Sequence, residues 1–129
     1  MAELIILVAF LGTLILVVLL MLPFKVIITS TSLKIGRFLP FEIPLRNIEN
    51  IDIKQQYPKT IRRVHGFDSG DVKRGIFETP DGRQIRLHIY SEYPPFIEII
   101  HQGGLCVLNT KSSEKTEQIF KELKKSARF

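Results

Sequence analysis

The sequence has a single cysteine and no tryptophan, and these two shortages exclude several kinds of site. With Cys106 alone, an intramolecular disulfide and a four-cysteine zinc site are impossible. Its place in the apolar run Leu105-Cys106-Val107-Leu108 indicates a small buried hydrophobe. The three tyrosines are scattered, and no predicted strand interleaves exposed aromatic and basic residues as nucleic-acid stacking requires. We therefore expect no nucleic-acid partner.

Motifs of catalysis and of metal binding are also missing. The chain contains no nucleophile elbow, P-loop, HExxH motif or paired-carboxylate arrangement. His65, His88 and His101 lie far apart, and no histidine or cysteine pair has the spacing of metal ligands. Asp68-Ser69-Gly70-Asp71 lacks the rest of a calcium loop and is typical of a turn. We expect neither enzymatic activity nor a bound cofactor or metal.

Charge is absent from Leu4 to Leu22, and this run predicts a transmembrane helix over residues 1–23. Nineteen residues reach roughly 28 Å as a helix, close to the ~30 Å core of a bilayer. A buried helix of a soluble protein and a cleaved signal peptide are the alternatives, but a signal peptide needs a basic start and a small-residue cleavage site. Lysine and arginine occur only after the run, which predicts an outside N-terminus, a cytoplasmic remainder and a cell-membrane location.

The remainder, residues 24–129, has the length of one domain. It carries eighteen basic and twelve acidic residues, since Glu3 is the only acid outside it, and so has a formal charge of +6. This excess favours anionic partners, including acidic lipid headgroups, although a solvated basic surface gives the same count.

Hydrophobic alternation predicts a series of short strands after the apolar run. Two hairpins follow from clear turn signals, Pro80-Asp81-Gly82 and Gln102-Gly103-Gly104. The strands themselves are expected at 25–36 (two strands), 37–44 (a bend or a short edge segment), 48–54, 76–79, 83–90, 96–101 and 105–109. Residues 55–75 lack periodicity and are predicted to be a long loop, with one short edge strand around 61–67 as the alternative.

The period changes to that of a helix after Ser112. Ile119, Phe120 and Leu123 recur at helical spacing, acidic residues come early and lysines late, and Ser112 or Ser113 suits the N-cap. This amphipathic helix is expected to lay its apolar stripe over the strands. The predicted fold is therefore mainly β, a seven-stranded β-barrel or sandwich capped by a C-terminal α-helix.

This order of strands and helix resembles the pleckstrin-homology-like (PH-like) domains of bacteria, which often stand beside membrane helices. The resemblance covers most of residues 24–126 and rests on apolar and glycine landmarks: Leu33-Lys34-Ile35, 43–48, Gly66, Gly70, Gly75-Ile76-Phe77, Leu108-Asn109 and the helix 114–123. It implies a PH-like fold. An OB-type barrel tethered to the membrane is the rival architecture, but it normally lacks so long a closing helix.

The resemblance also implies a binding function. Eukaryotic relatives of this fold bind phosphoinositides through basic residues between the first two strands, or bind peptides by strand addition. Here the first turn, Thr29 to Ser32, has no lysine or arginine, which argues against phosphoinositide specificity. We expect a non-catalytic protein-binding or assembly module at the cytoplasmic membrane face.

The strongest candidate ligand-binding residues lie in the predicted loop. They are five cations, which an anchored loop would bring together: Lys59, Arg62, Arg63, Lys73 and Arg74. Anionic-lipid sensing through residues 59–74 is the alternative function, and an ordinary solvated loop balanced by Asp68 and Asp71 is the competing interpretation.

Overall fold

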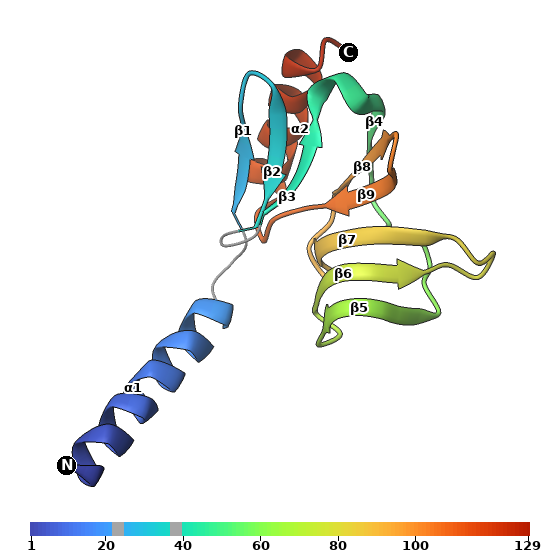
Figure 1. Cartoon of the computed structure of the whole chain (residues 1–129). Helices are drawn as coiled ribbons and strands as arrows, with labels where there is room; N and C mark the ends of the chain where they lie inside the picture. Colours follow the sequence, from blue (N-terminus) through green and yellow to red (C-terminus); the bar gives the residue numbers. More distant parts are fainter. Residues whose placement is uncertain (22–24, 37–39) are drawn as a thin grey trace.

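The fold consists of two β-sheets, whose strands are mostly antiparallel, together with an N-terminal and a C-terminal helix (Figure 1). It is seen in a computed structural model of the whole chain, which describes residues 1–21, 25–36 and 40–129. The smaller sheet has the order β1-β2-β3 and is formed by β1 (Val26–Ile28), β2 (Ser32–Ile35) and β3 (Phe41–Pro44). The 3-10 helix η1 (Leu45–Asn47) leads out of it.

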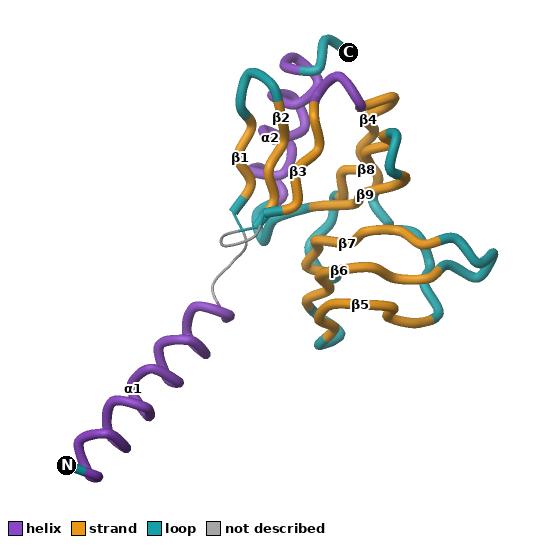
Figure 2. Tube along the Cα trace, viewed as in Figure 1, coloured by secondary structure: helices purple, strands orange, loops and turns teal. Residues whose placement is uncertain are grey.

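The larger sheet has the order β4-β8-β9-β7-β6-β5. Neighbouring strands are antiparallel except β7 and β9, which run parallel. Its strands are β4 (Ile48–Lys54), β5 (Arg62–Asp68), β6 (Val72–Glu78), β7 (Gln84–Tyr90), β8 (Phe96–His101) and β9 (Gly104–Leu108). Figure 2 shows β4, β8 and β9 beside the smaller sheet, while β5, β6 and β7 extend away from it. The two sheets together form a sandwich-like arrangement.

The main core lies between the smaller sheet, the near half of the larger sheet and the C-terminal helix α2 (Ser113–Ser126). Leu33, Ile43, Ile97 and Leu123 are at most 1% exposed within it. The predicted stripe of α2 is confirmed, because Leu123 is buried and Ile119 and Phe120 pack against the same cluster. The Ser112 hydroxyl accepts a hydrogen bond from the Lys115 backbone N–H, so Ser112 is the N-cap.

A second apolar cluster covers the opposite face of the larger sheet. It contains Phe77 on β6, three residues of β7, Phe96 on β8 and Val107 on β9. Tyr57, in the connection before β5, packs its ring edge-on against Phe96 with 5.2 Å between ring centroids. The apolar residues that alternate along β7 are all buried: Ile85, Leu87 and Ile89.

The predicted barrel is wrong. Closure of a barrel requires the last strand to pair with the first. Among the described residues, β4 pairs only with β8 and β5 only with β6, so both ends of the larger sheet stay open, and the smaller sheet is separate. The strands number nine in the described part of the chain, in place of the predicted seven. A closed OB-type barrel is excluded for the same reason.

The N-terminal helix α1 (Ala2–Met21) forms where the apolar run predicts a helix, and its described side chains are exposed. The predicted transmembrane span is corrected, however, because no helix of the described residues is both long and apolar enough to cross a membrane. Pro23, predicted to end the span, lies outside the described residues.

Candidate functional site

Residues 55–75 do not form the predicted loop, because most of them build a hairpin of two seven-residue strands, β5 and β6. Gly66 and Gly75 lie opposite each other with φ angles of +113° and +131°. A Cβ atom on Gly75 would stand 2.1 Å from the His65 carbonyl oxygen, so the close approach of the two strands requires glycine at this point. The alternative of an edge strand around 61–67 is therefore correct.

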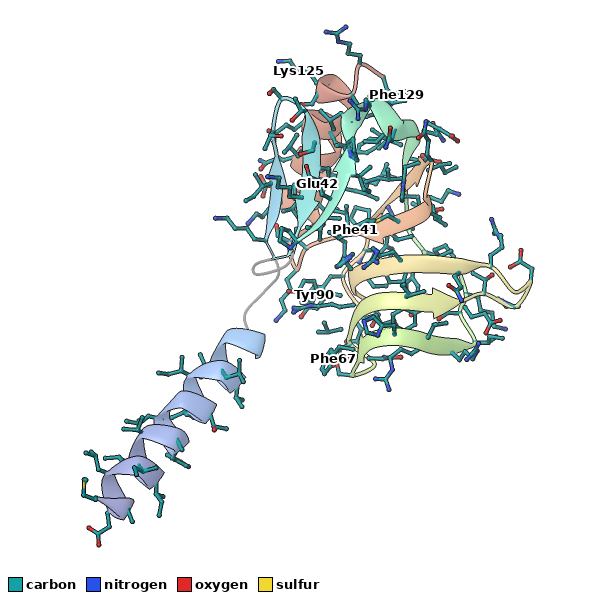
Figure 3. The ribbon with its side chains drawn as sticks, in the orientation of Figure 1. Phe41, Glu42, Phe67, Tyr90, Lys125 and Phe129 are labelled. Carbon is teal, nitrogen blue, oxygen red and sulfur yellow. The ribbon has the colours of Figure 1, made fainter. Side chains whose placement is uncertain are left out.

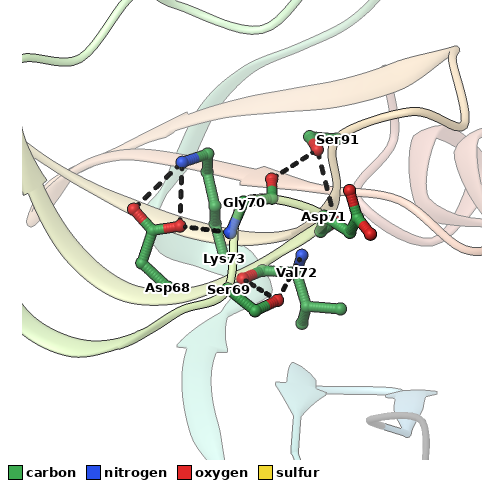
Figure 4. Close-up of polar contacts among 7 residues, drawn as sticks. All are labelled: Asp68, Ser69, Gly70, Asp71, Val72, Lys73 and Ser91. Atoms are coloured by element: carbon green, nitrogen blue, oxygen red, sulfur yellow. Dashed lines mark hydrogen bonds and ion pairs between the residues drawn. The ribbon is translucent and has the colours of Figure 1, made fainter.

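The turn of this hairpin is held by hydrogen bonds within the turn and by hydrogen bonds to Ser91 (Figure 4). The Asp68 carboxylate accepts a bond from the Gly70 backbone N–H at 2.8 Å. The Ser91 hydroxyl, which follows β7, donates to the Gly70 carbonyl at 2.7 Å. The Ser91 N–H donates to the Asp71 carbonyl at 2.8 Å, so the turn is fixed to the end of β7.

The register of β5 against β6 distributes the five predicted cations over both faces of the sheet. Lys73 and Arg74 are consecutive on β6, so their side chains point to opposite faces. Arg62 and Arg63 are likewise consecutive on β5. Lys59 precedes the hairpin and, together with Lys73, lines an open cavity of about 470 Å³. The structure thus brings Lys59 near Lys73 but does not gather all five cations at one point.

Two of the five cations have carboxylate partners within the hairpin. Arg62 forms an ion pair with Glu78, its register partner on β6. The Lys73 ammonium lies 3.0 Å from the Asp68 carboxylate. The Gly70 backbone N–H, the Lys73 ammonium and the more distant Arg63 charge hold the pKa of Asp68 below its ordinary value, against the opposing effect of partial burial. No ion pair is recorded for Lys59 or Arg63 within the described parts of the chain.

β5 presents an unusually open edge. All seven of its residues are exposed, and no described strand lies on its outer side. Val64 is 38% and Phe67 is 55% exposed, and Ile61, directly before the strand, is 58% exposed. Figure 3 shows Phe67 on this outermost strand. The register passes from Arg63 to His65, so Val64 forms a bulge.

The apolar residues on this edge were not singled out by the sequence pattern. Ile61, Val64 and Phe67 recur three residues apart and match neither strand alternation nor a buried run. The usable signal was the turn pattern Asp68-Ser69-Gly70-Asp71, at which β5 ends and after which β6 begins. A turn signal of this kind predicts a hairpin even where the residues beside it lack the hydrophobic alternation of strands.

The histidines and the cysteine are not arranged for metal binding or nucleophilic attack. The described residues contain no group of three or more histidine, cysteine, aspartate or glutamate side chains that could hold a metal ion. Cys106 is fully buried, and burial raises the pKa of its thiol to about 12. A thiol in that state is almost entirely protonated at neutral pH and makes a poor nucleophile.

No family model, curated protein or solved structure matches this chain.

Proposed function

We propose that this protein is a non-catalytic binding module that recognises an extended segment of a partner protein by adding it as a strand beside β5. The observation that carries the proposal is that β5 is an edge strand of the larger sheet and that all seven of its residues are exposed. A strand in that position offers backbone N–H and C=O groups that no described strand satisfies on its outer side. Peptide recognition by strand addition uses such groups for affinity and the neighbouring side chains for specificity.

The side chains of the edge favour an acidic and apolar partner segment. Arg63 has no carboxylate partner among the described residues, and Lys59 adds a second such cation just before the strand. The exposed Ile61, Val64 and Phe67 supply apolar contacts between these charges. Basic residues on an edge also discourage pairing with other basic strands, so the charge restricts the choice of partner.

The chemistry of the buried groups supports binding without catalysis. The only thiol is inaccessible and protonated, as its raised pKa requires. His88 is 8% exposed and therefore has little access to a substrate. The sequence resemblance predicts that the chain is related to the PH-like domains. This relationship is part of the proposal and stays a prediction.

Hydrogen exchange of the β5 amides in the full-length protein tests the proposal. The probe is an eight-residue peptide that alternates glutamate with valine, and its matched control alternates lysine with valine. At a concentration ten times its Kd, the acidic peptide is expected to slow exchange of the outward-facing β5 amides about tenfold, because only about a tenth of the protein stays free. The basic peptide is expected to leave these amides unchanged.

Two double variants distinguish the effect of the charges at the β5 edge from the effect of the protein's net charge. Lys59→Gln/Arg63→Gln is expected to weaken binding of the acidic peptide, whereas Lys115→Gln/Lys121→Gln, which removes the same charge from exposed positions of α2, is expected to leave it intact. Equal protection by both peptides, or none by either, would refute strand addition. Salt-sensitive binding to anionic vesicles with no response to the peptide would show that the ligand is lipid and not a protein segment. Lipid binding is the alternative that the basic segment 59–74 predicts.

A further inference from the structure

A second concave site lies where the two sheets approach each other, away from the β5 edge. It is a cavity of about 200 Å³ beside Arg86 of β7, Phe41 of β3 and His101 of β8. Figure 3 shows Phe41 between the two sheets. Apolar side chains complete much of the wall: Ile76, Ile85 and Leu105. The cavity therefore combines one cation, one imidazole and an apolar lining.

Arg86 is held in place by stacking. Its guanidinium carbon lies 4.0 Å from the centroid of the Phe41 ring. Stacking occupies the flat face of a guanidinium and leaves its five N–H donors, which lie in the plane, able to bind an anion. Arg86 is only partly exposed, and it forms no ion pair with any described carboxylate. The residues outside the description, 22–24 and 37–39, include no acid.

His101 supplies a neutral donor. Its Nδ1 atom accepts a hydrogen bond from the Gly103 N–H at 3.1 Å, so in the neutral ring the proton is on Nε2. Burial and the Arg86 charge lower the pKa of His101, while the Glu49 carboxylate of β4 opposes them. The lowered pKa favours the neutral imidazole, which presents a single N–H.

The cavity continues into a wider groove of about 490 Å³. Four residues line both spaces: Gln84, Ile85, His101 and Leu105. Ile100, which is 44% exposed, adds an apolar wall to the groove. The nearby Arg83 is already paired with Asp81 at 2.9 Å, so among the described residues that line the two spaces Arg86 is the cation left for an anionic ligand.

We infer that this site binds a small monocarboxylate with an apolar body, its carboxylate on the Arg86 guanidinium and its body against Leu105 and Ile85. One guanidinium with one neutral N–H balances a single negative charge, whereas a phosphate dianion would need further cations. The apolar lining would leave a small inorganic anion without contacts. The inference does not depend on strand addition at β5, which lies elsewhere on the larger sheet.

Titration of the full-length protein with phenylacetate, followed by NMR, tests the inference. We expect a Kd on the order of 1 mM for so small a ligand, with shifts of the Arg86 Nε–H, the Gly103 amide and the Leu105 methyl signals. Phenylacetamide has the same apolar body without the charge, and it is expected to bind at least about tenfold more weakly, since it lacks the charge-assisted hydrogen bonds.

Variants assign the binding to the named groups. Arg86→Gln is expected to weaken phenylacetate binding about tenfold or more, and Arg46→Gln, at an exposed position of η1, is expected to leave it unchanged. Gly103→Ala is the second test, because the added Cβ would meet the His101 ring at 2.9 Å and displace it. Equal affinity for phenylacetate and phenylacetamide, or full affinity in Arg86→Gln, would overturn the inference.

Discussion

Acid is expected to destabilise this protein through His88, which is buried between two arginines. The side chain is 8% exposed and stacks on Phe41 with 6.1 Å between ring centroids. Burial, and then the charges of Arg86 and Arg74, lower the pKa of His88 from 6.5 to about 4. The folded state therefore holds this imidazole neutral at a pH where the unfolded chain has protonated it.

The sign and size of the effect follow from proton linkage. Because the pKa of His88 is lower in the folded state, only the unfolded chain takes up the proton as the pH falls. The protein therefore has its full stability above pH 6.5 and loses stability as the pH falls towards 4. Between pH 7 and pH 5 the expected loss is about 2 kcal/mol in the free energy of unfolding. His101, whose pKa is also lowered, adds to the loss in the same direction. Asp68 and Asp81 have pKa values below 3.8 and so contribute little in this window.

Urea unfolding at pH 7, 6 and 5 measures this loss. His88→Gln removes the titrating group, so its stability is expected to fall by much less than that of the unmodified protein over the same range. His65→Gln, which replaces an exposed histidine of β5, is the matched control and is expected to follow the unmodified protein. A stability that does not change between pH 7 and pH 5, or a full loss retained in His88→Gln, would refute the reasoning.

Three further predictions concern single buried or strained positions. Asn109→Ala is expected to cost about 2–4 kcal/mol in chemical denaturation, because the fully buried amide accepts from the Tyr90 N–H at 2.7 Å and donates to the Tyr90 carbonyl at 2.9 Å. Gly75→Ala is expected to cost at least about 2 kcal/mol and to release β5 amides to rapid exchange, since its Cβ would collide with the His65 carbonyl oxygen; unchanged exchange would contradict this. Cys106 is expected to resist iodoacetamide at pH 8 until urea unfolds the protein, and rapid alkylation of the folded state would show the thiol to be accessible.

Local sequence signals predicted those elements whose residues carry their own pattern. The helix α2 was predicted because its cap, its charges and its apolar stripe all agree. The hairpins around Pro80-Asp81-Gly82 and Gln102-Gly103-Gly104 were predicted from their turns. β5 was left as an alternative because its stability comes from pairing with β6 and from the turn, and not from burial of its own side chains.

Pairings between distant strands were not predictable in the same way. The parallel pairing of β7 with β9 inserts β9 between β7 and β8, and no local pattern encodes that choice. The expected barrel was wrong because the strands at the two ends of this sheet, β4 and β5, do not pair with each other among the described residues. The polar face of β7 is also largely covered, so His88 and Tyr90 are buried although their alternation with apolar residues was typical of a solvent-facing side.

The candidate site shows the same limit. The candidate cations are clustered along the sequence, but strand register decides which of them share a face. Lys73 and Arg74 are adjacent in sequence and lie on opposite faces of β6. Arg86 was not a candidate at all, because its stacking on Phe41 depends on how the two sheets pack.

Hydrogen exchange at the open edge of β5 tests the proposed binding function most directly. The measurement compares the β5 amides of the full-length protein alone, with the peptide that alternates glutamate and valine, and with the one that alternates lysine and valine. Selective protection by the acidic peptide, lost in Lys59→Gln/Arg63→Gln, is the result expected of strand addition. Exchange of these amides that is the same with either peptide as with none would contradict it.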